Sequence, residues 1–332
     1  METSSAITMT SPECYTSIFA PGLLQGKTAL VTGGGSGIGF EIAMALAIQG
    51  CNVVLMGRRL PFLEEAVQKL KVAIASYTKG HNIKVLAYAG DVRSVEDGEG
   101  AVDFTLTHCN RLDILVNSAA GNFLANANEL KTKGFQTVMN IDTVGVFNMA
   151  RAAFPALQAV KKNSSSPLGR QESERGGVII NISATLQYGA TWFQIHASAA
   201  KSAIDSMTRS LGLEWGSHNI RVVGIAPGPI ADTPGMTKLA PGVDTEAVKE
   251  TVAEFIPIGR MGNKEDIAMM CLYLCSPAGT FITGETIVVD GGHWLYKPPM
   301  MPPDMVTEMS RQVESKSRAM GPGASSKPIS KL

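Results

Sequence analysis

Residues 28–39 read TALVTGGGSGIG, an apolar segment of strand length that runs directly into a loop with five glycines. The segment EIAMALAIQG, which has a helical composition, continues from residue 41. Glycines at such a place let the backbone turn tightly and approach a pyrophosphate, which then lies at the positive N-terminus of the helix. The pattern predicts a nucleotide-binding loop, with a purely structural glycine turn as the alternative. The predicted contacts are Gly33, Ser36, Gly37, Ile38 and Gly39.

Apolar runs of strand length recur along the chain, with helical segments between them. They cover residues 28–32, 52–57, 83–90, 112–117, 177–183, 219–227 and 285–291. Strands that are apolar on both faces and alternate with helices indicate a parallel sheet that is covered on both sides. We therefore expect an α/β fold: a single doubly wound (Rossmann) parallel sheet of seven strands with helices on both faces.

The alternation also indicates three parts of the chain. Residues 1–26 form an N-terminal extension, residues 27–292 form the nucleotide-binding catalytic domain, and residues 293–332 form a C-terminal tail. The tail is rich in Pro, Met, Ser and Lys and has no evident helical or strand period, so we expect it to stay mobile.

The tail ends in Ser330-Lys331-Leu332. This tripeptide is the address that the peroxisomal import receptor reads at a C-terminus. The sequence therefore predicts the import receptor as a partner and the peroxisome as the location.

Composition excludes several other classes of partner. Lys plus Arg equals Asp plus Glu at 29 each, so no global charge favours nucleic acid. No apolar run approaches the length of about 18 residues that a transmembrane helix needs, so we expect no membrane insertion. The five cysteines contain no CxxC pair, and Cys271 and Cys275 fit a buried helix face better than a metal site. No metal is expected.

The second expected strand ends in Gly57-Arg58-Arg59. An NAD-binding fold usually carries an acid at this point for the ribose 2′-hydroxyl. Two guanidinium groups suit a 2′-phosphate instead, by charge and by bidentate geometry. We therefore predict NADP(H) as the cofactor, and the alternative is that Arg58 and Arg59 are solvated residues that open the next helix.

Further cofactor contacts are expected where the other strands end, because ligands bind beyond the carboxyl ends of strands in such sheets. The long Pro- and Gly-rich segment 227–242 after the sixth strand would be a lid over this site or a plain surface loop. The expected contacts are Asp91, Val92, Asn117, Pro227, Gly228 and Ile230.

Four motifs in order, TGGGSGIG, GDV, NSAAG and PGPI, together with Lys201, resemble the short-chain dehydrogenase/reductase superfamily over residues 26–292. Most members of that superfamily use a Tyr-x-x-x-Lys pair with a Ser and an Asn. Lys201 and Ser183 match two of these positions. Ala197 stands where the tyrosine is expected, and Asp142 stands where the asparagine is expected.

The missing tyrosine restricts the chemistry. Reduction of a ketone ends with a proton on oxygen and needs a donor that touches that oxygen. Reduction of a conjugated thioester places the hydride on a remote carbon and the negative charge on the thioester oxygen, and the proton then goes to carbon. Ala197 therefore argues against ordinary alcohol–ketone exchange. Asp142 is the candidate acid, acting directly or through water, or else it only bonds neighbouring backbone.

The runs TGGGSGIGF, AAGNF, VMNIDT and PGPI resemble a branch of the superfamily, the peroxisomal 2,4-dienoyl-CoA reductases. The resemblance implies NADPH-dependent reduction of 2,4-dienoyl-CoA to 3-enoyl-CoA, which serves β-oxidation of unsaturated fatty acids. It implies Asp142 as the proton source through water and Lys201 at the nicotinamide ribose. It also implies an acyl-CoA substrate and a homodimer or homotetramer.

The same resemblance implies three substrate contacts. Asn122 would bind the thioester oxygen and stabilise the dienolate. Phe123 would line the acyl site, and Arg93 would meet a phosphate of coenzyme A.

Two other readings stay open. The first is a reductase of another enoyl-CoA or of a carbonyl, in which Tyr188 or His196 replaces the missing donor, although a packed histidine is the more usual case. The second is a catalytically silent NADP-binding protein. Polar groups at both Asp142 and Asn122 argue against a silent protein, which has no need for them.

Overall fold

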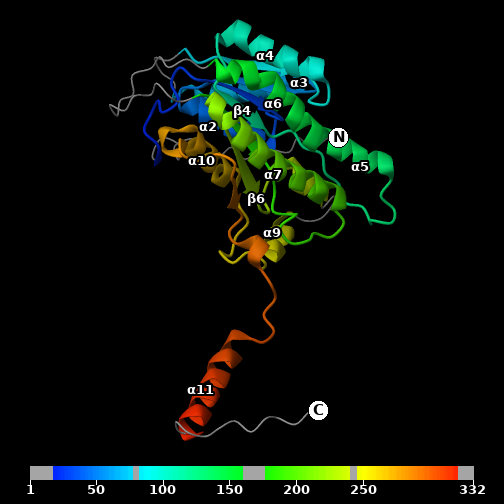
Figure 1. Ribbon diagram of the computed structural model, residues 1–332, viewed down its shortest axis with the longest axis vertical. Coiled ribbons are helices and arrows are strands. Elements are labelled where there is room, and N and C mark those ends of the chain that lie inside the picture. Colours follow the sequence, from blue (N-terminus) through cyan, green and yellow to red (C-terminus); the bar gives the residue numbers. More distant parts are fainter. Residues whose placement is uncertain (1–17, 78–81, 160–175, 240–244, 321–332) are drawn as a thin grey trace. The chain divides into compact units, whose positions relative to one another are not determined.

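In the computed structural model, which describes residues 18–77, 82–159, 176–239 and 245–320, seven strands form one parallel sheet (Figure 1). Their order is β3-β2-β1-β4-β5-β6-β7, and every neighbouring pair is parallel. The expected doubly wound sheet is therefore confirmed. The strands are β1 (Thr28–Thr32), β2 (Asn52–Gly57), β3 (Val85–Ala89), β4 (Ile114–Asn117), β5 (Val178–Ile182), β6 (Arg221–Pro227) and β7 (Thr286–Val289).

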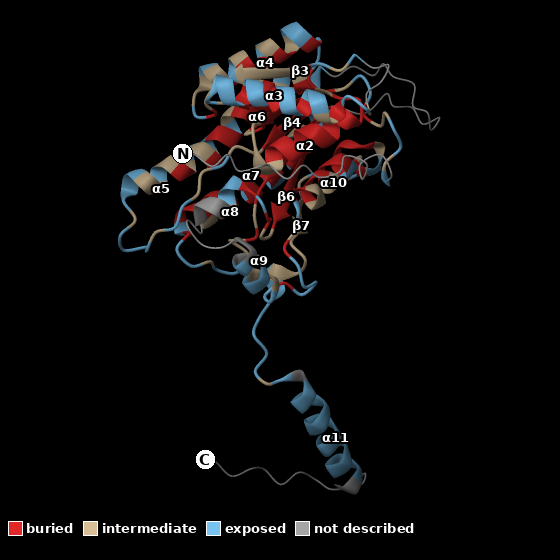
Figure 2. Cartoon of the chain, turned by 180° about the vertical axis from the view of Figure 1, so that it is seen from behind, coloured by how far each residue is buried: buried red, intermediate tan, exposed pale blue. Residues whose placement is uncertain are grey.

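Helices cover both faces, as expected. One apolar core lies between the sheet and α2 (Gly37–Ile48), α3 (Leu60–Ile74) and α10 (Lys264–Cys275). A second core lies between the other face and α4 (Val95–Cys109), α6 (Gly145–Gln158) and α7 (Ile195–Trp215). Figure 2 shows the buried strands between these two layers. The strand order reverses between β1 and β4, so the edge of the sheet beyond these two strands is where such folds bind ligands.

Short helices complete this unit, which spans Met1–Trp294. Their bounds are α5 (Thr132–Val138), the π-helix η1 (Met139–Val144), η3 (Gly216–His218), α8 (Pro234–Leu239), α9 (Thr245–Ala253), η4 (Pro277–Gly279) and η5 (His293–Leu295). The segment expected as a Pro- and Gly-rich loop thus contains the short helix α8. In the part of the chain that the structure describes, no helix is both long and apolar enough to cross a bilayer.

The folded unit reaches back before the expected boundary at residue 27. Leu24 is fully buried in the core, and its N–H donates to the carbonyl of Gln49 at 2.9 Å. The first seventeen residues lie outside the described part of the chain.

The second unit, Leu295–Leu332, contains the helix α11 (Pro303–Met320). The expectation that the tail lacks regular structure is therefore wrong. A proline, which suits a helix N-terminus, opens the helix, and Met305, Met309 and Val313 follow at a spacing of four residues. The import tripeptide lies outside the described residues.

Candidate active site

The glycine loop packs against the start of the segment that follows β4. Gly33 has a φ of 66°, and a Cβ built on it would lie 2.8 Å from the carbonyl oxygen of Ser118. The hydroxyl of Thr32 accepts hydrogen bonds from the N–H groups of Ser118 and Ala119, at 3.1 and 3.2 Å. Only glycine fits at position 33, and the predicted loop is held at the point where the strand order reverses.

The N-terminus of α2 is free to receive an anion. Ser36 is the N-cap residue, and its side chain makes no capping hydrogen bond. Gly37 has a φ of 58°, and a Cβ there would lie 3.2 Å from Cδ of Pro234, the first residue of α8. Helix α8 therefore begins beside the loop. Uncapped N–H groups together with the helix dipole are the arrangement that binds phosphate.

The residues at the end of β6 lie on the other side of the candidate cofactor site. Pro227 is the last residue of the strand, and the N–H of Gly228 donates to the carbonyl of Val289 at 3.2 Å. Ile230 is buried and forms a parallel bridge with Gly262. These positions lie at the same edge of the sheet as the glycine loop, because parallel strands end together.

The two predicted arginines follow β2 and are exposed. The guanidinium of Arg59 lies over the ring of Phe62, 4.6 Å from its centroid. The same ring lies against the glycine loop, because a Cβ on Gly35 would be 2.8 Å from it. Phe62 thus holds Arg59 beside the loop.

Asp91 and Arg93 bind each other. The carboxylate of Asp91 accepts three hydrogen bonds from the Arg93 guanidinium, two of them from Nε at 3.0 and 3.1 Å. This pairing lowers the pKa of Asp91. Val92 is buried, and its carbonyl accepts from the side chain of Asn148 at 3.1 Å. The expected contacts of Asp91 with the cofactor and of Arg93 with a phosphate of coenzyme A stay predictions.

Asn117 points along the sheet edge. Its Nδ2 donates to Oδ1 of Asn181 on β5 at 2.9 Å, and Nδ2 of Asn181 donates to the Thr208 hydroxyl at 2.9 Å. The Asn117 side chain is 3% exposed. It therefore links β4, β5 and α7, and the expected contact of Asn117 with the cofactor stays a prediction.

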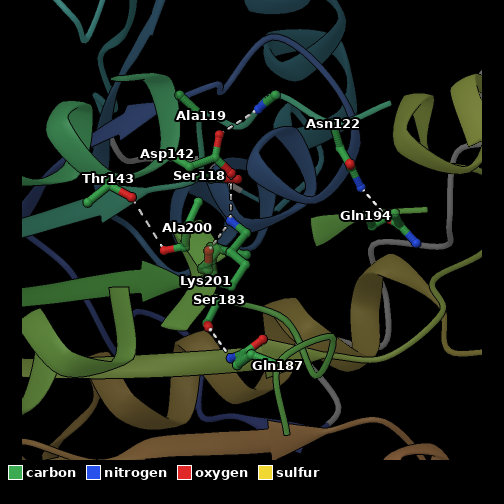
Figure 3. A network of polar contacts seen from close by, with 12 residues as sticks. Ser118, Ala119, Asn122, Asp142, Thr143, Ser183, Gln187, Gln194, Ala200 and Lys201 are labelled. Atoms are coloured by element: carbon green, nitrogen blue, oxygen red, sulfur yellow. Dashed lines mark hydrogen bonds and ion pairs between the residues drawn. The ribbon is translucent and has the colours of Figure 1, made fainter. Parts of the chain in front are cut away.

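The lysine and the aspartate that take part in the predicted chemistry lie together (Figure 3). Nζ of Lys201 is 3.2 Å from Oδ2 of Asp142, and the two side chains are 9% and 1% exposed. Lys201 also donates to the carbonyl of Ile182 at 3.0 Å. Oδ1 of Asp142 accepts from the N–H of Gly121 at 2.7 Å. One carboxylate oxygen is thus held by backbone, and the other faces the ammonium.

The position of Asp142 depends on an irregular helix. Asp142 lies in the π-helix η1, between α5 and α6, and Thr143 in the same turn donates to the carbonyl of Ala200 at 3.4 Å. Single turns of π-helix often occur at functional sites because they re-aim side chains. Ala197, the residue in the tyrosine position, is buried on α7 one turn before Lys201.

Ser183 faces a second carboxylate. Its hydroxyl donates to Oδ1 of Asp205 at 2.7 Å, and Nε2 of Gln187 donates to Oδ2 of Asp205 at 2.5 Å and to the Ser183 hydroxyl at 3.3 Å. Thr286 on β7 also donates to Asp205, at 3.2 Å. Asp205 is 4% exposed. The Ser183 hydroxyl therefore donates its proton to Asp205, and its expected catalytic role stays a prediction.

The side chain of Asn122 forms a hydrogen bond with Gln194, a residue that no sequence motif indicated. Its Nδ2 donates to Oε1 of Gln194 at 2.6 Å, and its Oδ1 accepts from the N–H of Phe123 at 2.8 Å. Figure 3 shows the Asn122 and Gln194 side chains directed toward each other. Phe123 is 37% exposed.

The two alternative proton donors have unfavourable surroundings. Burial, followed by the charge of Asp205, raises the pKa of Tyr188 to about 12, so its phenol is a poor acid. His196 is fully buried, and its ring stacks on Phe123 with centroids 4.3 Å apart. Burial lowers the pKa of His196 below its usual 6.5. His196 is thus a packed, neutral histidine.

Sequence reasoning missed Gln187, Gln194 and Asp205. No motif marks them, although Asp205 and Lys201 are one turn apart on α7, and this spacing alone places both on one face. Cys271 and Cys275 are buried on α10 as expected. Within the described ranges, no cluster of three or more His, Cys, Asp or Glu side chains is arranged to hold a metal ion.

Comparisons with known proteins agree with this geometry. The family described as enoyl-(acyl carrier protein) reductase matches residues 33–293. A protein of Arabidopsis thaliana named peroxisomal 2,4-dienoyl-CoA reductase, (3E)-enoyl-CoA-producing, is 49% identical over 95% of this chain and 99% of its own length. A protein of Pongo abelii with the same name is 42% identical over 86% of this chain and 89% of its own.

A solved structure gives the same result for the fold. The 3-ketoacyl-(acyl-carrier-protein) reductase from Brucella melitensis, in complex with NADH, is 29% identical, with a TM-score of 0.68. The match covers 82% of this chain and 99% of that one.

Proposed function

This chain belongs to the short-chain dehydrogenase/reductase family, and we propose that it reduces 2,4-dienoyl-CoA to 3-enoyl-CoA with NADPH in the peroxisome. The observation that carries the proposal is the buried pair of Asp142 and Lys201 next to Ala197. The usual phenol is replaced by a methyl group, while a carboxylate is held at the same site. This arrangement suits a reaction in which the proton goes to carbon.

The reaction balances as follows. NADPH, when bound, supplies a hydride to C5 of the acyl chain. The C4–C5 and C2–C3 double bonds are lost, C3–C4 and C1–C2 double bonds form, and the carbonyl electron pair moves to the thioester oxygen. A proton added at C2 then restores the carbonyl group and gives 3-enoyl-CoA.

Asn122 stabilises the charge on the thioester oxygen. Because Nδ2 carries two hydrogens and Gln194 takes one of them, the second is left for a substrate oxygen. The Ser183 hydroxyl donates to Asp205 and is not directed to this role. A donor that is already oriented in a water-poor site is an effective means of lowering the barrier.

Asp142 and Lys201 supply the proton. Because the two groups form an ion pair, the carboxylate is better suited to hold and polarise a water molecule than to act as a neutral acid. That water gives a proton to C2, the ammonium of Lys201 neutralises the resulting hydroxide by way of Asp142, and solvent then restores the proton to Lys201. Lys201, whose side chain also donates to the Ile182 carbonyl, would bind the nicotinamide ribose.

The choice of NADPH over NADH rests on Arg58 and Arg59. The open N-terminus of α2 and the glycine loop fit the pyrophosphate, and Arg59 is held beside the loop by Phe62. Two guanidinium groups with no acid at the end of β2 support a 2′-phosphate. Gly33, Ile38, Gly39, Asp91, Val92, Pro227, Gly228 and Ile230 would line the rest of the cofactor site.

Assembly and location complete the proposal. Val144, Phe147 and Leu213 are exposed apolar residues around α6 and α7, and they support a homodimer or homotetramer. The terminal tripeptide supports import, and deletion of residues 330–332 from a fluorescently labelled chain is expected to leave it in the cytosol.

The first test is oxidation of NADPH, followed by absorbance, with purified protein and a 2,4-dienoyl-CoA. We expect turnover with NADPH, much slower turnover with NADH, and none with a saturated acyl-CoA. Turnover of simple ketones without turnover of dienoyl-CoA would favour a carbonyl reductase instead. NADPH binding without turnover of any substrate would favour a silent binding protein.

A further inference from the structure

We propose that Gln194 is a positioning residue that fixes the orientation of the Asn122 carboxamide, so that one N–H of Asn122 faces the thioester oxygen. This inference rests on the proposed function. It assigns a role to a residue that no motif marks, and the hydrogen bonds between two loops carry it.

The first step is the polarity of the Asn122 amide. The N–H of Phe123 donates to Oδ1 of Asn122 at 2.8 Å, and Nδ2 of Asn122 donates to Oε1 of Gln194 at 2.6 Å. The Phe123 N–H therefore sets which end of the amide is the acceptor. Gln194 engages one hydrogen of Nδ2 and so holds the plane of the amide, which gives the second hydrogen a fixed direction.

The second step is the fixed position of Gln194. Its side chain is buried, with 8% of the residue exposed, and its carbonyl accepts from the N–H of Ser198 at 2.9 Å in the first turn of α7. The residue is thus fixed at its backbone carbonyl and at Oε1 of its side chain. Gln194 is thus a rigid partner for Asn122.

A backbone hydrogen bond also joins the two loops. The carbonyl of Phe193 accepts from the N–H of Ala125 at 3.0 Å, and this bond joins the same two segments as the contact between Asn122 and Gln194. Phe193 has a φ of 62°, in the left-handed region that bulky residues rarely occupy. A residue in this strained conformation persists only where the surrounding contacts hold it. The contacts here direct Gln194 toward Asn122.

The consequence concerns the rate of the chemical step. Stabilisation of a developing oxyanion depends on donors that need no reorientation when the charge appears. Asn122 loses this property if Gln194 is removed, although its own side chain remains. The NADPH site, which lies on the glycine loop and Arg59, is not part of this contact.

The test begins with Gln194→Met, which keeps the length of the side chain and removes the acceptor. We expect kcat with 2,4-dienoyl-CoA to fall by about 10- to 100-fold, and the dissociation constant for NADPH to stay within about twofold. The melting temperature controls for misfolding.

A double-mutant cycle separates positioning from a general structural effect. On an Asn122→Ala background, Gln194→Met is expected to have almost no further effect on kcat, because its action passes through Asn122. Gln187→Met is the matched control, since Gln187 contacts Ser183 and Asp205; its effect is expected to be the same on both backgrounds. Equal effects of Gln194→Met on both backgrounds would overturn the inference.

A crystal structure of Gln194→Met tests the orientation without reference to the substrate. We expect the Asn122 carboxamide to rotate or to occupy two conformers. An unchanged carboxamide would reject the inference even if the protein reduces dienoyl-CoA. A rotated carboxamide in a protein that does not reduce dienoyl-CoA would reject only the proposed function.

Discussion

The carboxylate of Asp142 and the ammonium of Lys201 lie 3.2 Å apart, and both side chains are buried. The two groups come from different helices, η1 and α7, and each has a backbone partner that fixes it, Gly121 for Asp142 and Ile182 for Lys201. A buried ion pair contributes little to stability by itself, because the cost of desolvation is large. Its place beside Ala197 is therefore better explained by function.

Asp142→Asn keeps the shape of the side chain and the acceptor for the Gly121 N–H, and it removes the charge. We expect kcat to fall by about 10²- to 10⁴-fold while NADPH binding changes only a few-fold. Steady-state rates and fluorescence titration with NADPH measure the two quantities. Asp142→Ala leaves Lys201 buried without its partner and should also lower the free energy of unfolding, by about 3–5 kcal/mol. An equal loss of rate and NADPH binding in Asp142→Asn would mean that Asp142 is structural.

Arg59→Ala removes a guanidinium that Phe62 holds beside the glycine loop. A charge-assisted hydrogen bond is worth about 1.5–3 kcal/mol, so kcat/KM for NADPH should fall by about 10- to 100-fold. The kcat/KM for NADH should hardly change. Lys69→Ala is the control, because Lys69 is a basic residue on α3, the helix that Arg59 precedes, and it pairs with Glu65. A parallel fall for both cofactors would show that Arg59 does not read the 2′-phosphate.

Tyr188→Phe removes the phenol that could replace the missing tyrosine. Since the pKa of Tyr188 is raised to about 12, we expect the rate with dienoyl-CoA to stay within about threefold. The ring keeps its edge contact with Trp294, so the fold should be unaffected. A fall in this rate of about a hundredfold would show that Tyr188 is the proton donor and would support the carbonyl-reductase reading.

His196 makes stability depend on pH. Burial lowers its pKa from the usual 6.5, so between the two values the unfolded chain binds the proton and the folded protein does not. The stability contribution is present above about pH 6.5 and is lost as the pH falls below it. The melting temperature of the wild type should fall between about pH 8 and about pH 5.5. The melting temperature of His196→Gln should fall less over the same range. His108→Gln, at an exposed histidine, should match the wild type; a match of His196→Gln with the wild type would contradict the expectation.

The sequence by itself determined the sheet and the positions of its loops. Apolar runs of strand length, alternating with helices, are local patterns, and they predict a parallel sheet whatever the distant contacts are. The glycine loop, Arg58 and Arg59 were found because they directly follow strands. The pairing of Ala197 with Lys201 followed from helical spacing alone. The tail was the exception, because α11 lies among prolines and serines that obscured its period.

Only the tertiary structure decided which side chains meet. Asn122 and Gln194 are 72 residues apart, and their contact depends on the left-handed backbone of Phe193. Ser183 and Asp205 meet because α7 packs against β6, the neighbour of β5, and Asp142 reaches Lys201 through a π-helical turn that no residue pattern marks. Contacts between loops depend on the conformation of both loops at once, whereas helix and strand patterns depend on neighbours in the chain. The chain thus specifies the nucleotide fold locally, and folding alone brings Asn122 and Gln194 together.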